Sequence, residues 1–366
     1  MVKGDIITPN ELDASLISQW RSLLSKNAAL DSPFYAPEFT QALGAARHDA
    51  RIAILQDGGE IVGFLPFHKC RAGVAKPIGG QLSDYQGVIA AADHSFDAPE
   101  LLAACRLNAY DFNHAPVIQD TLRSGAYHFS SSPFMALTEG FEAYRKDLPQ
   151  KDRMEIKNSN RRRRKIEREI GELRFVANDR DDAAWTQLMA WKRDSFAQMG
   201  VHFGYDTPWV ASIFQHFRTV ETAPFAGLMS SLYAGGRLVA AHFGIRSQTV
   251  WHWWFSSYDT ALSKYGPGLL LILEAARLCP EMGVSKIDFG RGDQHYKLVL
   301  ANGRTELCEG SIVRSASRAG VLRGVQKSAL RLVSNTPLKR YESLARRASS
   351  RFLTSMRLRE GGEAIT

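Results

Sequence analysis

The chain has 366 residues, of which 45% are hydrophobic, and it carries 46 Lys and Arg against 38 Asp and Glu. This length suits two domains of ordinary size, and the composition is that of a globular protein, which excludes general disorder. Charges interrupt the first thirty residues, and the longest apolar run, residues 269–273, falls far short of the roughly 20 needed to cross a bilayer, so we expect a cytoplasmic protein.

The charge is unevenly distributed along the chain. From residue 315 onward there are eleven Lys and Arg against three Glu, so the net charge of +8 resides in this tail. The positive and negative charges of residues 1–314 are equal in number. A second basic run, residues 151–168, has nine Lys and Arg against three acids. Neither run by itself indicates nucleic acid as a partner.

The cysteines give no sign of a metal or redox site. Cys70, Cys105, Cys279 and Cys308 are widely separated, without a C-x-x-C pair or a short Cys/His cluster. A free cysteine is more often a small buried hydrophobe than a nucleophile. We therefore expect reduced structural thiols and no metal.

In chain order, the first half begins with two expected helices, residues 11–29 and 37–46. A strand, a tight turn and a second strand follow over residues 51–70. Asp57, Gly58 and Gly59 supply the positive φ angles that a short hairpin turn requires, between flanks rich in β-branched and apolar residues. These elements form the first of two expected domains, residues 1–150.

The segment 151–170 is almost wholly polar and is predicted to be a connecting helix. Two interpretations remain open. It is either a solvated helix that touches the body through a few isoleucines or an electropositive surface for the phosphates of a substrate.

The second expected domain, residues 171–314, repeats the order of the first. Helices are predicted over residues 182–198 and 208–219, then a hairpin over 228–247 with Gly235 and Gly236 at its turn, then an aromatic strand over 249–255. A helix over 268–282, closed by Gly283, precedes a strand over 284–289. This pattern predicts a mixed α/β fold of two similar halves and not a doubly wound sheet.

Three segments of the second half concentrate chemistry. The turn from Lys264 to Gly268 has two glycines before a helix, so backbone amides can approach an anion such as a pyrophosphate, although the same pattern also serves as a plain helix start. It is neither a dinucleotide motif nor an ATP-binding loop, which argues against NAD and ATP. Residues 288–297 place acids, an arginine, a histidine, a tyrosine and a lysine at a strand end. Aromatic residues of the strand 249–255 are suited either to a sugar-stacking wall or to a core.

Together these segments resemble a known family. The motifs W-x-F-S-S-Y-D (253–259), Y-G-P-G-L-L-L-x-L-E-A (265–275) and D-F-G-R-G-D-x-x-Y-K (288–297) resemble GNAT-type acetyltransferases of bacterial cellulose and exopolysaccharide biosynthesis, the CelD/BcsL-like family. That family is similar to the Fem peptidoglycan-bridge ligases, which also have two GNAT-like halves. The resemblance is strongest over residues 185–313. It implies two tandem GNAT-like (acyl-CoA N-acyltransferase) domains, each a mostly antiparallel sheet flanked by helices.

The resemblance also implies an acyl transfer from acetyl-CoA or another acyl-CoA to an amine or hydroxyl of a saccharide or other small acceptor. The donor pyrophosphate is expected at Tyr265, Gly266, Pro267, Gly268 and Leu269. The base is expected to be Asp293 or Asp288 and the acid Tyr296 or Tyr258, with His242 as a further catalytic candidate. Substrate contacts are assigned to Arg291, Lys297, Trp254, Trp191 and Lys192.

The tail, residues 315–366, is predicted to form a basic amphipathic helix, either packed on the body or lying on the anionic inner membrane. Two other functions remain open. One is a Fem-like aminoacyltransferase that uses aminoacyl-tRNA, with the run Arg161 to Arg164 as a phosphate contact, and the other is a non-catalytic accessory protein of polysaccharide synthesis.

Overall fold

The computed structural model describes residues 2–200 and 203–314. Its strands are β1 (Lys3–Ile7), β2 (Ala50–Asp57), β3 (Glu60–Lys69), β4 (Val74–Pro77), β5 (Ile89–Ala90), β6 (Ala109–Pro116), β7 (Ala126–Ala136), β8 (Leu173–Val176), β9 (Ala226–Ala234), β10 (Arg237–Arg246), β11 (Val250–Tyr258), β12 (Lys286–Asp288) and β13 (Gly303–Val313). Its α-helices are α1 (Ala14–Ser25), α2 (Pro37–Ala46), α3 (Ala98–Ala104), α4 (Asp120–Arg123), α5 (Gly140–Asp147), α6 (Gln150–Glu169), α7 (Asp182–Gln198), α8 (Pro208–Thr219), α9 (Pro267–Leu278) and α10 (His295–Leu300). The expected basic tail lies outside the described residues.

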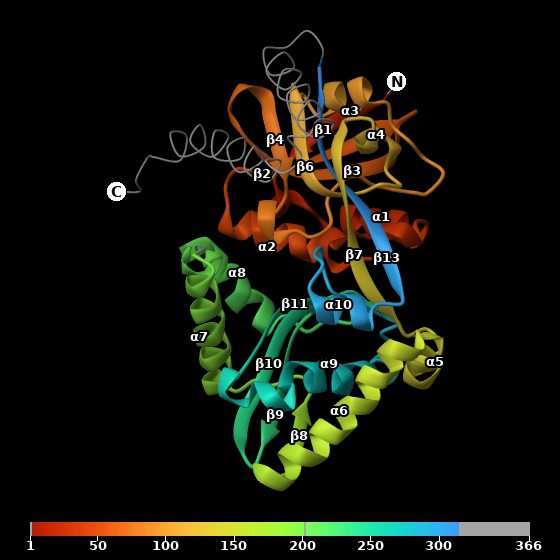
Figure 1. Cartoon of the computed structure of the whole chain (residues 1–366). Helices are drawn as coiled ribbons and strands as arrows, with labels where there is room; N and C mark the ends of the chain where they lie inside the picture. Colours follow the sequence, from red (N-terminus) through yellow and green to blue (C-terminus); the bar gives the residue numbers. More distant parts are fainter. Residues whose placement is uncertain (1, 201–202, 315–366) are drawn as a thin grey trace, which may run out of the picture.

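The strands form one continuous sheet made of two similar halves (Figure 1). In the first half, β1, β2, β3 and β4 pair antiparallel and β6 joins β4 in parallel. In the second half, β8, β9, β10 and β11 pair antiparallel and β12 joins β11 in parallel. The predicted fold class, a mixed and mostly antiparallel sheet in two halves flanked by helices, is confirmed.

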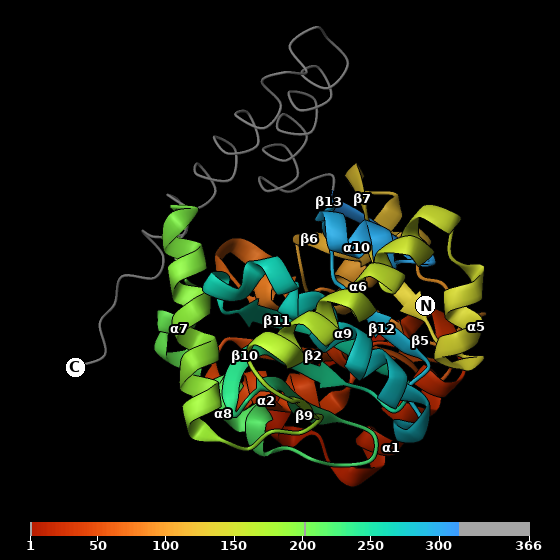
Figure 2. The same ribbon diagram turned by 60° about the horizontal axis from the view of Figure 1, so that its bottom comes forward.

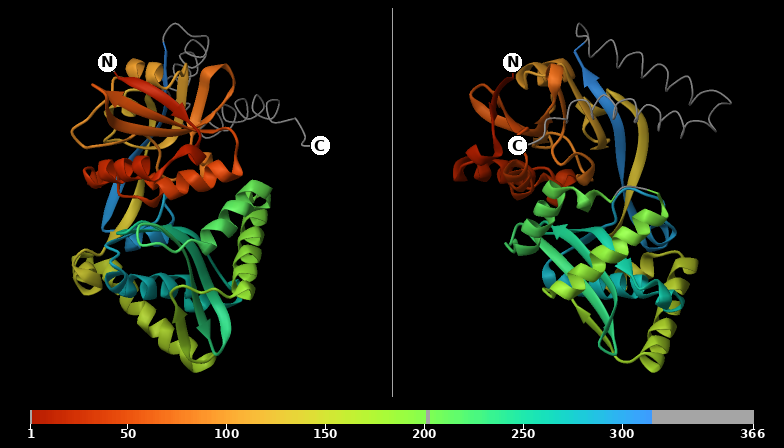
Figure 3. Two further views of the ribbon diagram at one scale, coloured as in Figure 1. Left: turned by 180° about the vertical axis from the view of Figure 1, so that it is seen from behind. Right: turned by 90° about the vertical axis from the view of Figure 1, so that its left-hand side faces the viewer.

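Two long strands connect the halves, and each of them pairs across the boundary. Strand β7 follows β6 in the chain but pairs with β12, and β13 follows β12 but pairs with β6. The two strands also pair antiparallel with each other. Both run from one half into the other in Figure 3. The proposed division into residues 1–150 and 171–314 stays a prediction, because these strands place part of each segment in the sheet of the other.

Local signals correspond closely to the observed elements. The two predicted hairpins are β2–β3 and β9–β10, and their turns have positive φ at Gly58, Gly59, Gly235 and Gly236. The predicted C-cap is confirmed, since Gly283 has φ 71° after a short 3-10 helix, Cys279–Met282, that extends α9. The expected first helix is shorter than predicted because Asp13 caps α1 through a hydrogen bond to the Leu16 amide at 2.8 Å.

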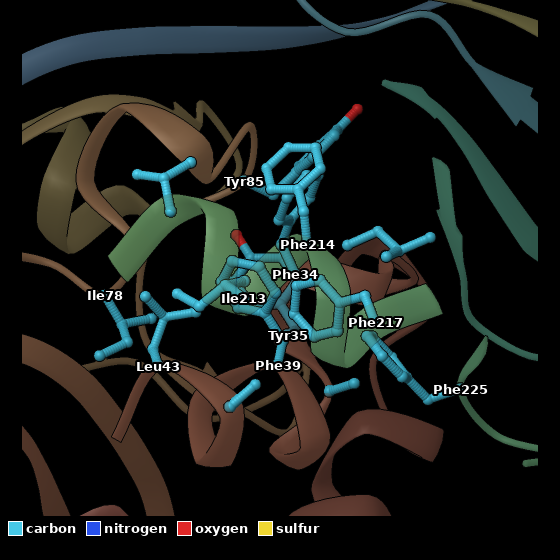
Figure 4. Packing of buried hydrophobic residues seen from close by; sticks show 14 of the residues in the cluster. Phe34, Tyr35, Phe39, Leu43, Ile78, Tyr85, Ile213, Phe214, Phe217 and Phe225 are labelled. Atoms are coloured by element: carbon cyan, nitrogen blue, oxygen red, sulfur yellow. The ribbon is translucent and has the colours of Figure 1, made fainter. Parts of the chain in front are cut away.

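The two halves share a hydrophobic core. Figure 4 shows Phe214 and Phe217 of α8 among Phe34 and Phe39 of the first half. The rings of Phe39 and Phe217 stack with centroids 5.8 Å apart. Buried aromatic pairs of this kind add about 0.5–1.5 kcal/mol beyond the area they bury. This core fixes the halves relative to each other.

The helices of the second half cover opposite faces of its sheet. Helices α7 and α8 pack with Met229 and Phe243 on one face, whereas α6 and α9 pack with Leu228 and Trp251 on the other. Figure 2 shows α6 beside α9 and α7 on the other side of β10 and β11. In the described part of the chain, no helix is long and apolar enough to cross a membrane.

Candidate active site

The candidate site begins where two parallel strands separate. Strand β12 pairs with β11 only from Val250 to His252, and this pairing ends at the contact between His252 and Asp288. Strand β11 continues to Tyr258 alongside β10. Its backbone from Trp253 onward therefore has β10 on one side and no partner from β12 on the other, so a ligand can lie along it.

The expected donor turn lies just beyond this open stretch. Gly266 adopts the left-handed conformation, φ 62°, and begins α9, with Pro267 in the first turn. No side chain caps this helix start, so the amides of Gly268 and Leu269 are available to an anion. A Cβ on Gly268 would lie 3.2 Å from Cδ1 of Tyr258, which places Tyr258 against the turn.

Two basic side chains of α6 and Lys264 lie beside the donor turn. A Cβ on Gly266 would lie 3.4 Å from Nη1 of Arg162, whose guanidinium pairs with Glu155 at 2.6 Å. The ammonium groups of Lys165 and Lys264 lie 5.8 Å and 4.8 Å from the ring centroid of Tyr265. The predicted basic helix therefore lies where the phosphates of a donor are expected.

A buried polar network lies at the point where β11 and β12 separate. Nε2 of His252 lies 2.8 Å from Oδ2 of Asp84, and its Nδ1 lies 3.5 Å from Oδ1 of Asp288. Burial alone would lower the pKa of His252, but the hydrogen bonds and charges of the two carboxylates outweigh it and raise the pKa to about 9. His252 is therefore an imidazolium at neutral pH, with a carboxylate on each side.

Asp288 is fully engaged inside this network. Oδ1 accepts hydrogen bonds from Ser132 at 2.7 Å and from the amide of Gly290 at 2.8 Å, and Oδ2 accepts one from Tyr85. Burial raises the pKa of Asp288, but the bond to His252 and these donors overcome burial and lower it to about 2. With an exposure of 1%, Asp288 orients the site and does not face a substrate.

The first half contributes residues that the sequence analysis did not single out, Asp84, Tyr85 and His114. The Asp84 side chain is 21% exposed, and Nε2 of His114 lies 3.7 Å from its Oδ1. Burial lowers the pKa of His114 to about 4. The only local signal was a polar segment, residues 83–86, in a glycine-containing loop. Nothing in the sequence links that loop to residues 252 and 288.

Tyr296, one of the two predicted acids, lies near the open stretch of β11. It is the second residue of α10 and is 37% exposed, with its hydroxyl next to Ser256 on the open stretch of β11. Burial raises the pKa of Tyr296 to about 12, so the phenol keeps its proton at neutral pH. Asp293 is exposed in the turn before α10, close enough to Lys297 for its charge to raise the pKa of that lysine.

The basic residues of this loop hold the site together. Arg291 donates from Nη1 to the carbonyl of Asn113 in the first half at 3.1 Å. Lys297 donates from Nζ to the carbonyls of Gly290 and Arg291, each at 3.2 Å. Lys192, on α7, also approaches the site and donates to the carbonyl of Ser256 at 3.5 Å.

Three predicted residues lie away from the opening. His242 is fully buried, with its ring stacked on Trp253 at a centroid distance of 3.5 Å, so we do not retain it as a catalytic candidate. Trp254 packs in the core, 4.8 Å from the ring centroid of Phe214. Trp191 lines a separate pocket of about 400 Å³, together with Tyr233 and Arg237. In the described ranges, no group of three or more His, Cys, Asp or Glu side chains is arranged so that it could hold a metal ion.

Comparisons with known proteins agree with this architecture. Residues 153–298 match the family model described as Acetyltransferase (GNAT) domain. A conserved protein of unknown function from Bacteroides thetaiotaomicron is similar over 86% of this chain and 100% of its own, with 12% identity and a TM-score of 0.52. FemX is similar over 72% of this chain and 87% of its own, with 9% identity and a TM-score of 0.50. No curated protein matches the sequence.

Residues 153–298 thus match an acetyltransferase domain of the GNAT type, and the fold that contains them is mixed α/β. The domain includes the separating strands, the donor turn, Tyr296 and Lys297. Sequence identities of 12% and 9% show that the fold is shared, but they do not show that this chain has the activity of either protein. A GNAT domain supports an acyltransferase that uses acyl-CoA, whereas the cellulose and exopolysaccharide family stays a prediction.

Proposed function

We propose that this chain transfers an acetyl or other acyl group from acyl-CoA to an amine or hydroxyl of a cell-envelope sugar or polysaccharide precursor. The observation that carries the proposal is the open stretch of β11 beside the uncapped start of α9. The amides of Gly268 and Leu269 would hold the donor pyrophosphate, with Arg162 adding charge. The choice of a sugar acceptor rests on the sequence resemblance alone.

The reaction is a direct transfer. The acceptor nitrogen or oxygen attacks the thioester carbonyl and forms the new bond, and its proton passes to a carboxylate. Asp293 suits this role better than Asp288, because Asp293 is exposed and Asp288 is buried among donors. The carbon–sulfur bond breaks, and the phenol of Tyr296 donates a hydrogen bond to the departing thiolate, which then takes a proton from solvent.

The network of Asp84, His252 and Asp288 positions this machinery. It fixes the turn at Gly290, because the amide of Gly290 donates a hydrogen bond to Oδ1 of Asp288 at 2.8 Å. Oδ2 of Asp84 also lies only 2.7 Å from the position that a Cβ on Gly290 would take, which leaves no room for a side chain there. Lys297 then holds the carbonyls of Gly290 and Arg291. The loop that presents Asp293 and Tyr296 is thus anchored to both halves.

The test is a calorimetric titration with acetyl-CoA and with CoA. Micromolar binding is expected, and Gly268→Val should raise the dissociation constant at least ~10-fold, about 1.4 kcal/mol, because the branched side chain crowds Tyr258 and the amides. Gly204→Val is the matched control, since no atom lies within 4 Å of its Cβ position. Absence of binding to both ligands would reject the proposal in favour of an aminoacyl-tRNA donor or a non-catalytic accessory role.

A further inference from the structure

Two ammonium groups lie at the candidate site, close enough for the charge of Lys297 to lower the pKa of Lys192, and Lys192 has no counter-ion among the described residues. Lys192 is half-buried on α7, and its Nζ lies 5.4 Å and 5.5 Å from the ring centroids of Phe196 and Phe255. Its single hydrogen bond goes to the carbonyl of Ser256 at 3.5 Å. Among residues 2–200 and 203–314, no carboxylate pairs with it.

The second ammonium belongs to Lys297, which is 7% exposed. Two of its three N–H groups bond to carbonyl oxygens, and one remains. Asp84, Asp288 and Asp293 are near enough to oppose the effect of burial on the pKa of Lys297. Lys192 has no such compensation, because burial and the charge of Lys297 both lower the pKa of Lys192.

The placement of Lys192 indicates which substrate would meet it. The donor turn and α9 lie on the opposite face of the second sheet from α7. The phosphates of the donor are therefore accounted for on the α9 side. A group that reaches Lys192 comes from the α7 side, past Phe196 and Phe255, and reaches β11 next to Tyr296.

A partly desolvated ammonium without a counter-ion is costly, and a ligand anion removes that cost by supplying a charge-assisted hydrogen bond. We propose that Lys192, with the remaining N–H of Lys297, binds a carboxylate or phosphate of the acceptor, so that the acceptor is an acidic sugar or a sugar phosphate. This inference rests on the proposed acyl transfer and names the chemical class of its acceptor.

The test compares matched pairs of ligands, galacturonate with galactose and glucose 6-phosphate with glucose, by calorimetry on the full chain. At least one anionic member should bind about 10-fold more tightly than its neutral partner. Lys192→Met, which keeps the length and apolar stem, should abolish this preference, and Lys192→Arg should retain it. Lys69→Met is the control, because Lys69 is exposed on β3 in the other half.

Each outcome separates this inference from the proposed function. Equal binding of both members of each pair, no binding of the anionic members up to about 10 mM, or a preference that survives Lys192→Met would overturn the anion site. Titration with acetyl-CoA is measured separately on the same variants. If acetyl-CoA binds and no anion preference is found, the proposed acyl transfer is supported and the anion site is rejected. If an anion preference is found and acetyl-CoA does not bind, acyl-CoA is rejected as the donor and the anion site is supported.

Discussion

The imidazolium of His252 should make the stability of the fold depend on pH in a defined window. The pKa of His252 rises from 6.5 to about 9 on folding, which corresponds to about 3 kcal/mol at 1.36 kcal/mol per unit. Because the folded pKa is the higher one, this contribution is complete below pH 6.5 and is lost as the pH rises through 9. Burial lowers the pKa of His242 and His114 in the fold, so their titration in the unfolded chain near pH 6.5 adds stability as the pH rises to about 7.5, equally in the wild type and in a His252 variant.

The assay is urea unfolding of the wild type and of His252→Gln at pH 6, 7.5 and 9. Across this range the wild type should lose about 3 kcal/mol more unfolding free energy than the variant does, because the other histidines contribute equally to both. The variant should also be less stable at pH 6 by about 3–5 kcal/mol, because Asp84 and Asp288 lose their shared cation. His48→Gln, at an exposed position, should behave as the wild type. A wild-type stability that is flat from pH 6.5 to 9, or an unchanged slope in His252→Gln, would refute the reasoning.

Three further variants test the site. Tyr296→Phe should lower turnover at least ~10-fold without changing the affinity for acetyl-CoA, because only the phenol proton is lost; an unaffected rate removes Tyr296 from the mechanism. Asp293→Asn should lower turnover at least ~100-fold with donor binding intact, and an active Asn variant would show that another group accepts the proton. Arg162→Gln should weaken acetyl-CoA binding several-fold and reduce its salt dependence, whereas Arg168→Gln, at a side chain 72% exposed, should not; equal effects would place the donor phosphates elsewhere.

The sequence predicted local structure well wherever a single segment determines it. The Gly58–Gly59 and Gly235–Gly236 turns need positive φ whatever surrounds them, so the hairpins could be inferred from neighbouring residues alone. The same holds for the glycine start of α9 and for Gly283 at its end. For this reason the turn at residues 264–268 could be predicted from one short segment, and its role in holding a donor stays a prediction.

The rest of the site depends on contacts between distant residues. Asp84 and His252 are 168 positions apart in the chain, and Tyr85 and Asp288 are 203 apart. Nothing in a polar loop or in an aromatic strand specifies such a pairing. The same limit explains His242, because a histidine in a strand gives no sign of its neighbours, and here its ring stacks on Trp253 in the core.

The exchange of β7 and β13 sets the order in which a growing chain can complete its fold. When residue 150 leaves the ribosome, β6 still lacks the neighbour that arrives only with residues 303–313. The edge of β6 therefore stays unpaired while the whole second half is synthesised, and during this time it can pair with another chain. We therefore expect a chain released at residue 302 to yield aggregates and the full chain to yield soluble protein, because β13, the last strand of the described residues, closes both halves at once.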